Sequence, residues 1–127
     1  MPLIASLAAL LAAAFHVLFF VLESVTFRQP SVAARFGLTT PEQIAAVGPM
    51  AFNQGFYNLF LAIGIAGGLA LVAAGSVDAG RAVVLFACAC MVGAGLVLLS
   101  TNRRFVRSAA IQAVPPVIAI VAALVLK

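Results

Sequence analysis

Two ionisable side chains, His16 and Glu23, lie in a stretch of the sequence that is otherwise almost entirely apolar. They are seven residues apart, so on an α-helix they share a face and are separated by about 10.5 Å along the axis. Ionisable groups inside a membrane span are costly, and they tend to face the bundle interior, where they bind ligands or move protons. The pair, with Phe20 between its members, therefore predicts a helix face that packs against protein.

A second group consists of hydrogen-bonding side chains gathered in one short segment, namely Asn53, Gln54, Tyr57 and Asn58. On a helix these four fall within an arc of about 140°, and each can donate and accept hydrogen bonds. Gly55, which lies beside them, has no side chain, so another helix or a ligand can approach closely there. Gln112 adds one more amide, just before the bend that we expect at Pro115-Pro116.

These groups are predicted to lie at one level of the bilayer. The first apolar segment ends on the side where the second and fourth begin, so Glu23 and Gln112 lie about one turn inside the same surface, as do Asn53 and Gln54. We expect Glu23 to face these two amides, with Gln112 closing a third side. His16 and Asn58 lie deeper and would form the floor. The arrangement predicts a polar cup that opens toward one face of the membrane.

The same residues have a simpler interpretation as contacts between helices. Asn, Gln and His side chains join helices inside membranes and contribute about 0.6–2 kcal/mol for each contact. In that interpretation Glu23 would pair with Arg103 at the membrane surface. The sequence leaves both alternatives open.

The elements that position these residues are four apolar segments, each close to the roughly 20 residues that a helical span needs. The chain is 65% hydrophobic and only 8% charged, whereas a soluble domain has about 25% charged residues. We therefore predict an all-α, integral membrane four-helix bundle that forms one domain over residues 1–127. The expected spans are residues 3–27, 50–74, 82–99 and 109–126.

The link between the first two spans predicts a short interfacial helix. Thr40 can cap it, Pro41 suits its first position, and Gln43 completes a capping box. We expect this helix to break near Gly48-Pro49 and to enter the second span through a kink. A further turn or two of helix is expected over residues 30–36.

Topology follows from the basic residues. Five arginines lie in the first and third loops, namely Arg28, Arg35, Arg103, Arg104 and Arg107, whereas the other side carries Arg81 and Lys127. The positive-inside rule places the five-arginine side in the cytoplasm and both termini outside it. Small residues predict close helix contacts, either within the bundle or between copies in a homo-oligomer. They are Gly64 and Gly68 in the second span and Ala89, Gly93 and Gly95 in the third.

Several classes of function lack support in the sequence. No basic stripe with interleaved aromatic residues indicates nucleic-acid binding, and membrane lipids are the partners that flanking basic residues indicate. A single histidine argues against a His-based metal cage, and no cofactor motif is present. Cys88 and Cys90 are two positions apart on a predicted helix, so they point in different directions and are interpreted as small packing residues.

Taken together, these polar residues resemble the pattern of a family of small bacterial membrane proteins known as domain of unknown function 1304. The resemblance covers nearly the whole chain, and its most specific part is the stretch NQGFYN at residues 53–58. It implies four spans in a bacterial inner membrane, and it implies no activity. The residues that it highlights are His16, Glu23, Asn53, Gln54, Tyr57, Asn58 and Gln112.

Three functions are compatible with this pattern. The first is a cytoplasm-facing site that binds or transports a small, partly apolar or cationic ligand, with a proton exchanged at Glu23. The second is an intramembrane enzyme, for example an isomerase, in which His16 and Glu23 act as acid and base on a lipid-like substrate. The third is a structural or assembly subunit in which the polar groups only hold helices together.

Overall fold

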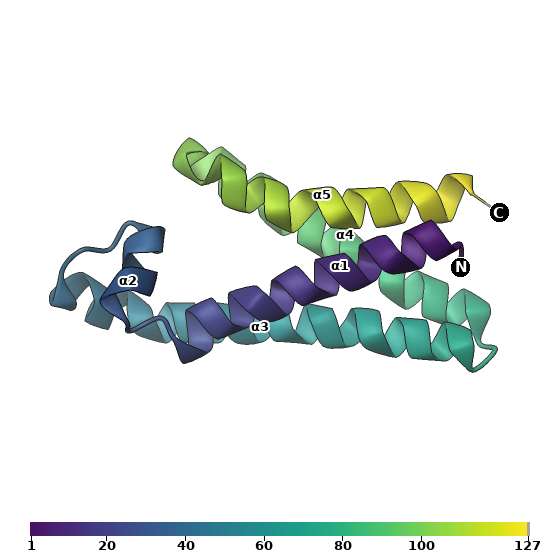
Figure 1. Cartoon of the computed structure of the whole chain (residues 1–127), viewed down its shortest axis with the longest axis horizontal. Helices are drawn as coiled ribbons and strands as arrows, with labels where there is room; N and C mark the ends of the chain where they lie inside the picture. Colours follow the sequence, from purple (N-terminus) through teal and green to yellow (C-terminus); the bar gives the residue numbers. More distant parts are fainter. Residues whose placement is uncertain (127) are drawn as a thin grey trace. The chain divides into compact units, whose positions relative to one another are not determined.

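The computed structural model describes residues 1–126 and shows an all-α membrane protein (Figure 1). Lys127, which entered the charge comparison, lies outside the described residues. Four helical segments in this part of the chain are long and apolar enough to cross a bilayer, and no strand occurs in it. The prediction of an all-α four-helix bundle is thereby confirmed, and the protein is a multi-pass membrane protein.

The helices follow one another with short connections. Their bounds are α1 Leu3–Phe20, the π-helix η1 Val21–Val25, α2 Pro30–Ala33, the 3-10 helix η2 Ala34–Phe36, α3 Pro41–Ala73, α4 Val77–Thr101, the 3-10 helix η3 Arg103–Phe105 and α5 Val106–Val125. They form two compact units, which are described separately. One contains Met1–Phe15 and Leu61–Lys127, and the other contains His16–Phe60.

The first unit has a core made largely of small side chains. Its fully or almost fully buried members are Ala9, Ala12, Ile65, Val84, Ala87, Cys88, Met91 and Ala119. The helices α4 and α5 pack against each other in this unit. Both cysteines are free, and Cys88 is completely buried, which fits the packing role predicted for it. Small core residues allow the helix backbones to come close, as membrane helices commonly do.

This unit contains close glycine contacts between α3 and α4 and between α4 and α5. A Cβ atom at Gly68 would lie 2.7 Å from Val84 Cγ2 and 2.9 Å from the Gly80 carbonyl oxygen. A Cβ at Gly95 would lie 3.0 Å from the Cβ of Ala113, whereas one at Gly93 would meet nothing within 4 Å. The close approaches predicted for Gly68 and Gly95 therefore occur within the chain.

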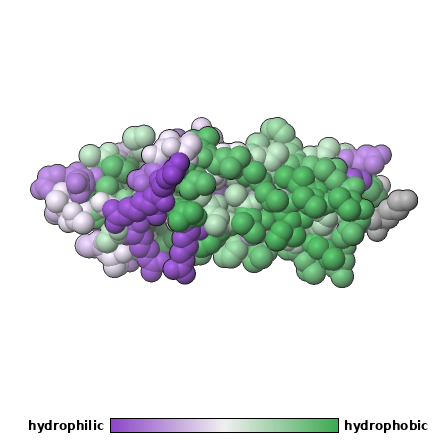
Figure 2. Space-filling model, turned by 90° about the horizontal axis from the view of Figure 1, so that it is seen from above, coloured by the Kyte–Doolittle hydropathy of each residue, from purple (hydrophilic) through white to green (hydrophobic). Residues whose placement is uncertain are grey.

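Much of the outer surface is apolar. Many large hydrophobic side chains point outward, among them Phe86, which is 71% exposed. On the face seen in Figure 2, hydrophobic side chains predominate. Such a surface is stable against hydrocarbon and unfavourable against water.

The second unit begins with the end of the first span and a folded connection. Pro30–Ala33 and Ala34–Phe36 form the short helices α2 and η2, which confirms the helical turns expected there. Gly37 ends them with a φ of 80°, a conformation that glycine adopts readily. The rings of Phe27 and Phe36 lie 5.4 Å apart and hold this connection together.

The capping box of α3 is confirmed. The Gln43 backbone N–H donates to Thr40 Oγ1 at 3.3 Å, and the Thr40 N–H donates to Gln43 Oε1 at 3.2 Å. The predicted break near Gly48-Pro49 is wrong, because α3 continues without interruption from Pro41 to Ala73. Pro49 removes only one backbone donor, and continuing the helix satisfies the neighbouring polar groups that a break would leave unpaired.

Two span boundaries also differ from the sequence prediction. The third span begins at Val77, earlier than the predicted residue 82. The fourth begins at the 3-10 turn Arg103–Phe105, where the Arg104 N–H donates to Asn102 Oδ1 at 3.0 Å. In both cases polar residues form the first helical turns, so the apolar run alone underestimated the length of the helix.

Candidate functional site

The centre of the candidate site is a hydrogen bond between two helices of the second unit. Asn58 Nδ2 donates to Glu23 Oε2 at 2.7 Å. Asn58 lies on α3 and is only 4% exposed, while Glu23 is partly buried. A carboxyl group and an amide thus meet within membrane-spanning segments, where unpaired polar groups are unfavourable.

The backbone that carries Glu23 is a π-helical turn rather than a continuation of α1. The Thr26 N–H donates to the Val21 carbonyl oxygen at 2.9 Å, and Thr26 Oγ1 donates to the same oxygen at 3.2 Å. The α-helical spacing that we used to align His16 with Glu23 therefore ends at Phe20. Single π-turns within α-helices are frequently found at functional sites, because they reorient one side chain.

Ser24 and Gly55 bring this turn against α3. Ser24 Oγ donates to the Phe52 carbonyl oxygen at 2.7 Å. A Cβ atom at Gly55 would overlap Ser24 Oγ and would lie 3.1 Å from the Cβ of Glu23. The close approach expected at Gly55 is confirmed. Ser24 was not among the predicted site residues, although a small hydroxyl residue beside the glutamate is visible in the sequence.

Phenylalanine rings form the apolar part of the site. The rings of Phe20 and Phe56 lie 5.1 Å apart at an interplanar angle of 74°. Phe56 also contacts Phe52 at 5.0 Å and Phe60 at 6.2 Å. Phe20 was named from the sequence, whereas the other three rings were not, although their spacing of four residues places them on one face of α3. Their rings provide an apolar, polarisable surface that suits hydrophobic or cationic groups.

In this unit, the remaining members of the polar segment on α3 form no hydrogen bond with Glu23. These exposed side chains are Asn53, Gln54 and Tyr57. The buried residues Ala51, Gly55 and Asn58 lie within an arc of about 60° on the helix, and Asn53 is about 140° from its nearer edge. We expected Glu23 to face Asn53 and Gln54, and the hydrogen bond that it accepts in this unit comes from Asn58.

The positions of His16 and Gln112 are known within their own units. His16 is completely buried, and its ring meets that of Phe19 edge to face at a centroid distance of 5.7 Å. Gln112 is also buried and lies in the other compact unit. The floor predicted from His16 and Asn58, and the third side predicted from Gln112, stay predictions.

Comparison with known proteins supports the family resemblance and adds no activity. A family model described as "Protein of unknown function (DUF1304)" matches residues 10–124. The match includes every candidate site residue named above. No curated protein and no solved structure matches the chain.

Proposed function

The chain belongs to the DUF1304 family, and since the description of that family names no activity, we propose from the site that the protein binds and transports a small, partly apolar cation in exchange for a proton at Glu23. The observation that carries this proposal is the Glu23–Asn58 hydrogen bond, which lies within membrane-spanning helices. The site that we propose faces the cytoplasm.

The chemistry follows from the two forms of a carboxyl group. In apolar surroundings a charged carboxylate is unfavourable, so it is stabilised either by a proton or by a bound cation. Proton and cation then compete for one group, and their competition links ligand movement to the proton gradient. Asn58 donates to only one of the two carboxyl oxygens. Among residues 16–60, which form its own unit, the other oxygen, Oε1, accepts no hydrogen bond, and we propose that it receives the ligand.

The aromatic residues supply the second part of the proposed recognition. Phe20 and Phe56 are in ring contact, and they precede Glu23 and Asn58 by three and two residues. A cation near an aromatic face gains about 0.5–2 kcal/mol, with the larger values in desolvated sites. This arrangement favours a cation that carries apolar substituents over a small hydrated ion such as Na⁺.

The competing explanation is that the hydrogen bond only joins helices, and a matched pair of glutamate variants separates the two. Glu23→Gln keeps the shape of the side chain but cannot exchange a proton. Glu42→Gln makes the same chemical change at an exposed position in the first turn of α3. Tetraphenylphosphonium is a suitable probe, because it is a cation with an apolar surface.

Titration calorimetry of the purified protein in two buffers of different ionisation enthalpy measures cation binding and proton release together. We expect the natural protein and Glu42→Gln to bind tetraphenylphosphonium and to release a proton. Glu23→Gln should stay folded and lose the proton release. If Glu23→Gln bound the cation with the same proton release, or if the natural protein bound none, the role of Glu23 would be that of a helix contact.

We also propose that the protein lies in a bacterial inner membrane with both termini outside the cytoplasm. The support is the excess of arginine in the first and third loops. Single cysteines at Ser76, Thr39 and Asn102, in a background with Cys88 and Cys90 replaced by alanine, test the orientation. An impermeant thiol reagent added to intact cells should label the cysteine at position 76 and neither of the others. The reverse labelling pattern would overturn the orientation.

A further inference from the structure

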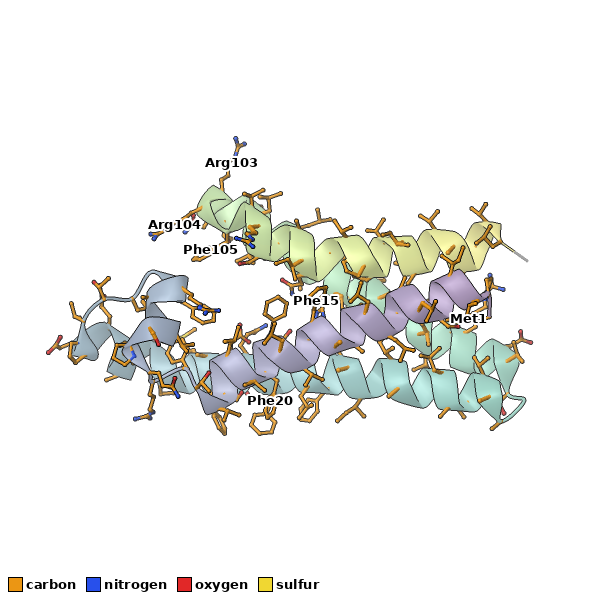
Figure 3. The ribbon with its side chains drawn as sticks, viewed as in Figure 1. Met1, Phe15, Phe20, Arg103, Arg104 and Phe105 are labelled. Atoms are coloured by element: carbon orange, nitrogen blue, oxygen red, sulfur yellow. The ribbon has the colours of Figure 1, made fainter. Side chains whose placement is uncertain are left out.

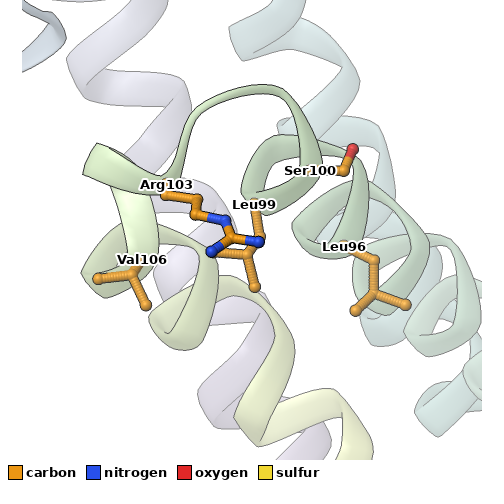
Figure 4. A pocket seen from close by; sticks show the side chains of 5 residues that line it. All are labelled: Leu96, Leu99, Ser100, Arg103 and Val106. Carbon is orange, nitrogen blue, oxygen red and sulfur yellow. The ribbon is translucent and has the colours of Figure 1, made fainter.

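A second polar feature lies at the connection between α4 and α5, entirely within the first compact unit. A hollow of about 730 Å³ is lined by Leu96, Leu99, Ser100, Arg103 and Val106 (Figure 4). Its residues come from the last turns of α4 and from the first turns of the segment that leads into α5. The hollow is therefore located at the ends of two spans, where lipid headgroups meet hydrocarbon.

The lining combines an apolar wall with one available cationic group. Leu96 and Val106 are 60% and 57% exposed, so they are accessible to a ligand. Ser100 Oγ donates to the Val97 carbonyl oxygen at 2.8 Å, so its hydroxyl proton is not available to a ligand. Among the described residues of its own unit, the guanidinium of Arg103 has no hydrogen-bond or ion-pair partner, and Figure 3 shows its side chain projecting away from the ribbon. Arg103 is thus the donor that this hollow offers.

The charged residues next to the hollow in the sequence are all basic. Arg104 and Arg107 follow Arg103 closely, and residues 79–126 contain no aspartate or glutamate. A guanidinium binds phosphate oxygens through two parallel N–H donors, which suits it to a phosphate diester. An apolar wall beside such a donor matches the acyl chains that are covalently attached to a phospholipid headgroup.

We propose that this hollow binds one anionic phospholipid, with the phosphate on Arg103 and an acyl chain along Leu96 and Val106. The apolar wall favours a lipid over free phosphate, which would gain nothing from contact with leucine and valine side chains. This site does not involve Glu23, so the proposal can be tested independently of the proposed transport function.

Native mass spectrometry of the detergent-solubilised protein can test the proposal with dioleoyl phosphatidylglycerol and dioleoyl phosphatidylcholine, which differ only in their headgroups. We expect about a fivefold preference for phosphatidylglycerol, which corresponds to about 1 kcal/mol at 1.4 kcal/mol per factor of ten. Arg103→Gln should abolish the preference. Arg107→Gln removes the same charge outside the hollow and should leave most of the preference intact.

The apolar wall has its own control. Leu96→Ser should weaken binding of both lipids, whereas Leu124→Ser changes a leucine that is similarly exposed on α5 but outside the hollow and should have no effect. Circular dichroism and size-exclusion chromatography establish that each variant is folded.

Three results would overturn the proposal. The first is an equal loss of preference in Arg103→Gln and Arg107→Gln, which would indicate a diffuse electrostatic attraction. The second is displacement of phosphatidylglycerol by millimolar inorganic phosphate, which would indicate a site for a free anion. The third is equal binding of the two lipids by the natural protein.

Discussion

Substituting Gly55 by alanine tests the geometry of the candidate site most directly. The added Cβ would overlap Ser24 Oγ and would lie 3.1 Å from the Cβ atoms of both Ser24 and Glu23. Ordinary carbon–carbon contacts are about 3.5–4.0 Å. The π-turn that carries Glu23 must therefore move away from α3, which strains the 2.7 Å hydrogen bond between Glu23 and Asn58.

The expected magnitude combines three effects. Overpacking of this kind costs about 1–3 kcal/mol, and loss of a hydrogen bond between membrane helices costs about 0.6 kcal/mol. The higher helix propensity of alanine offsets about 1 kcal/mol. We expect Gly55→Ala to lower the free energy of unfolding by about 1–2 kcal/mol in net terms. Because the shift separates Glu23 from Asn58, it should also weaken binding of tetraphenylphosphonium.

Gly48 provides the matched control on the same helix. A Cβ atom there would meet nothing within 4 Å, so Gly48→Ala should leave stability unchanged or raise it by up to about 1 kcal/mol. Unfolding in mixed micelles of increasing dodecyl sulfate fraction, followed by circular dichroism, measures both variants. Equal midpoints for Gly55→Ala and Gly48→Ala would refute the close contact between the π-turn and α3.

Three further outcomes test other parts of the fold. Gly68→Ala should lower the free energy of unfolding by about 1–3 kcal/mol, because the added Cβ would lie 2.9 Å from a backbone oxygen of α4. The Cβ of Gly67→Ala would meet nothing within 4 Å, so this variant should leave the stability unchanged in the same micelle assay. Arg81→Met should lower the free energy of unfolding by about 1.5–3 kcal/mol, because Arg81 donates a hydrogen bond at 2.6 Å to a carbonyl oxygen in the last turns of α5. An unfolding midpoint equal to that of Arg107→Met would contradict this. Thr40→Ala should cost about 1 kcal/mol of local helix stability, seen as faster amide exchange in the first turn of α3, and unchanged exchange would show that the capping box contributes nothing.

The membrane location and the number of spans were predictable from the sequence, because they depend on local composition. An uninterrupted apolar run of about 20 residues is stable in hydrocarbon only as a helix with its own backbone hydrogen bonds. The capping box at Thr40 was predictable for the same reason, since its hydrogen bonds join residues that are three positions apart. The error at Pro49 shows where local rules stop. A proline disfavours a helix, but the lipid environment penalises a broken helix more.

The composition of the candidate site was only partly predictable. The sequence indicated Glu23 and a polar segment on the second span as its two halves, and the structure joins them through a single residue, Asn58. Sequence spacing gives the angular relation between residues on one helix, but not how that helix is rotated toward its neighbour. The contact of Ser24 with Gly55 decides that rotation, and it turns Asn53 outward.

Local sequence therefore specifies which segments are helical and which polar residues they carry, because hydrophobicity and capping act over a few residues. Which of these polar groups meet depends on contacts between helices. The π-turn at Val21–Val25 and the hydrogen bond from Asn58 to Glu23 depend on packing between helices, because both require the backbone of one helix to approach the other at Gly55.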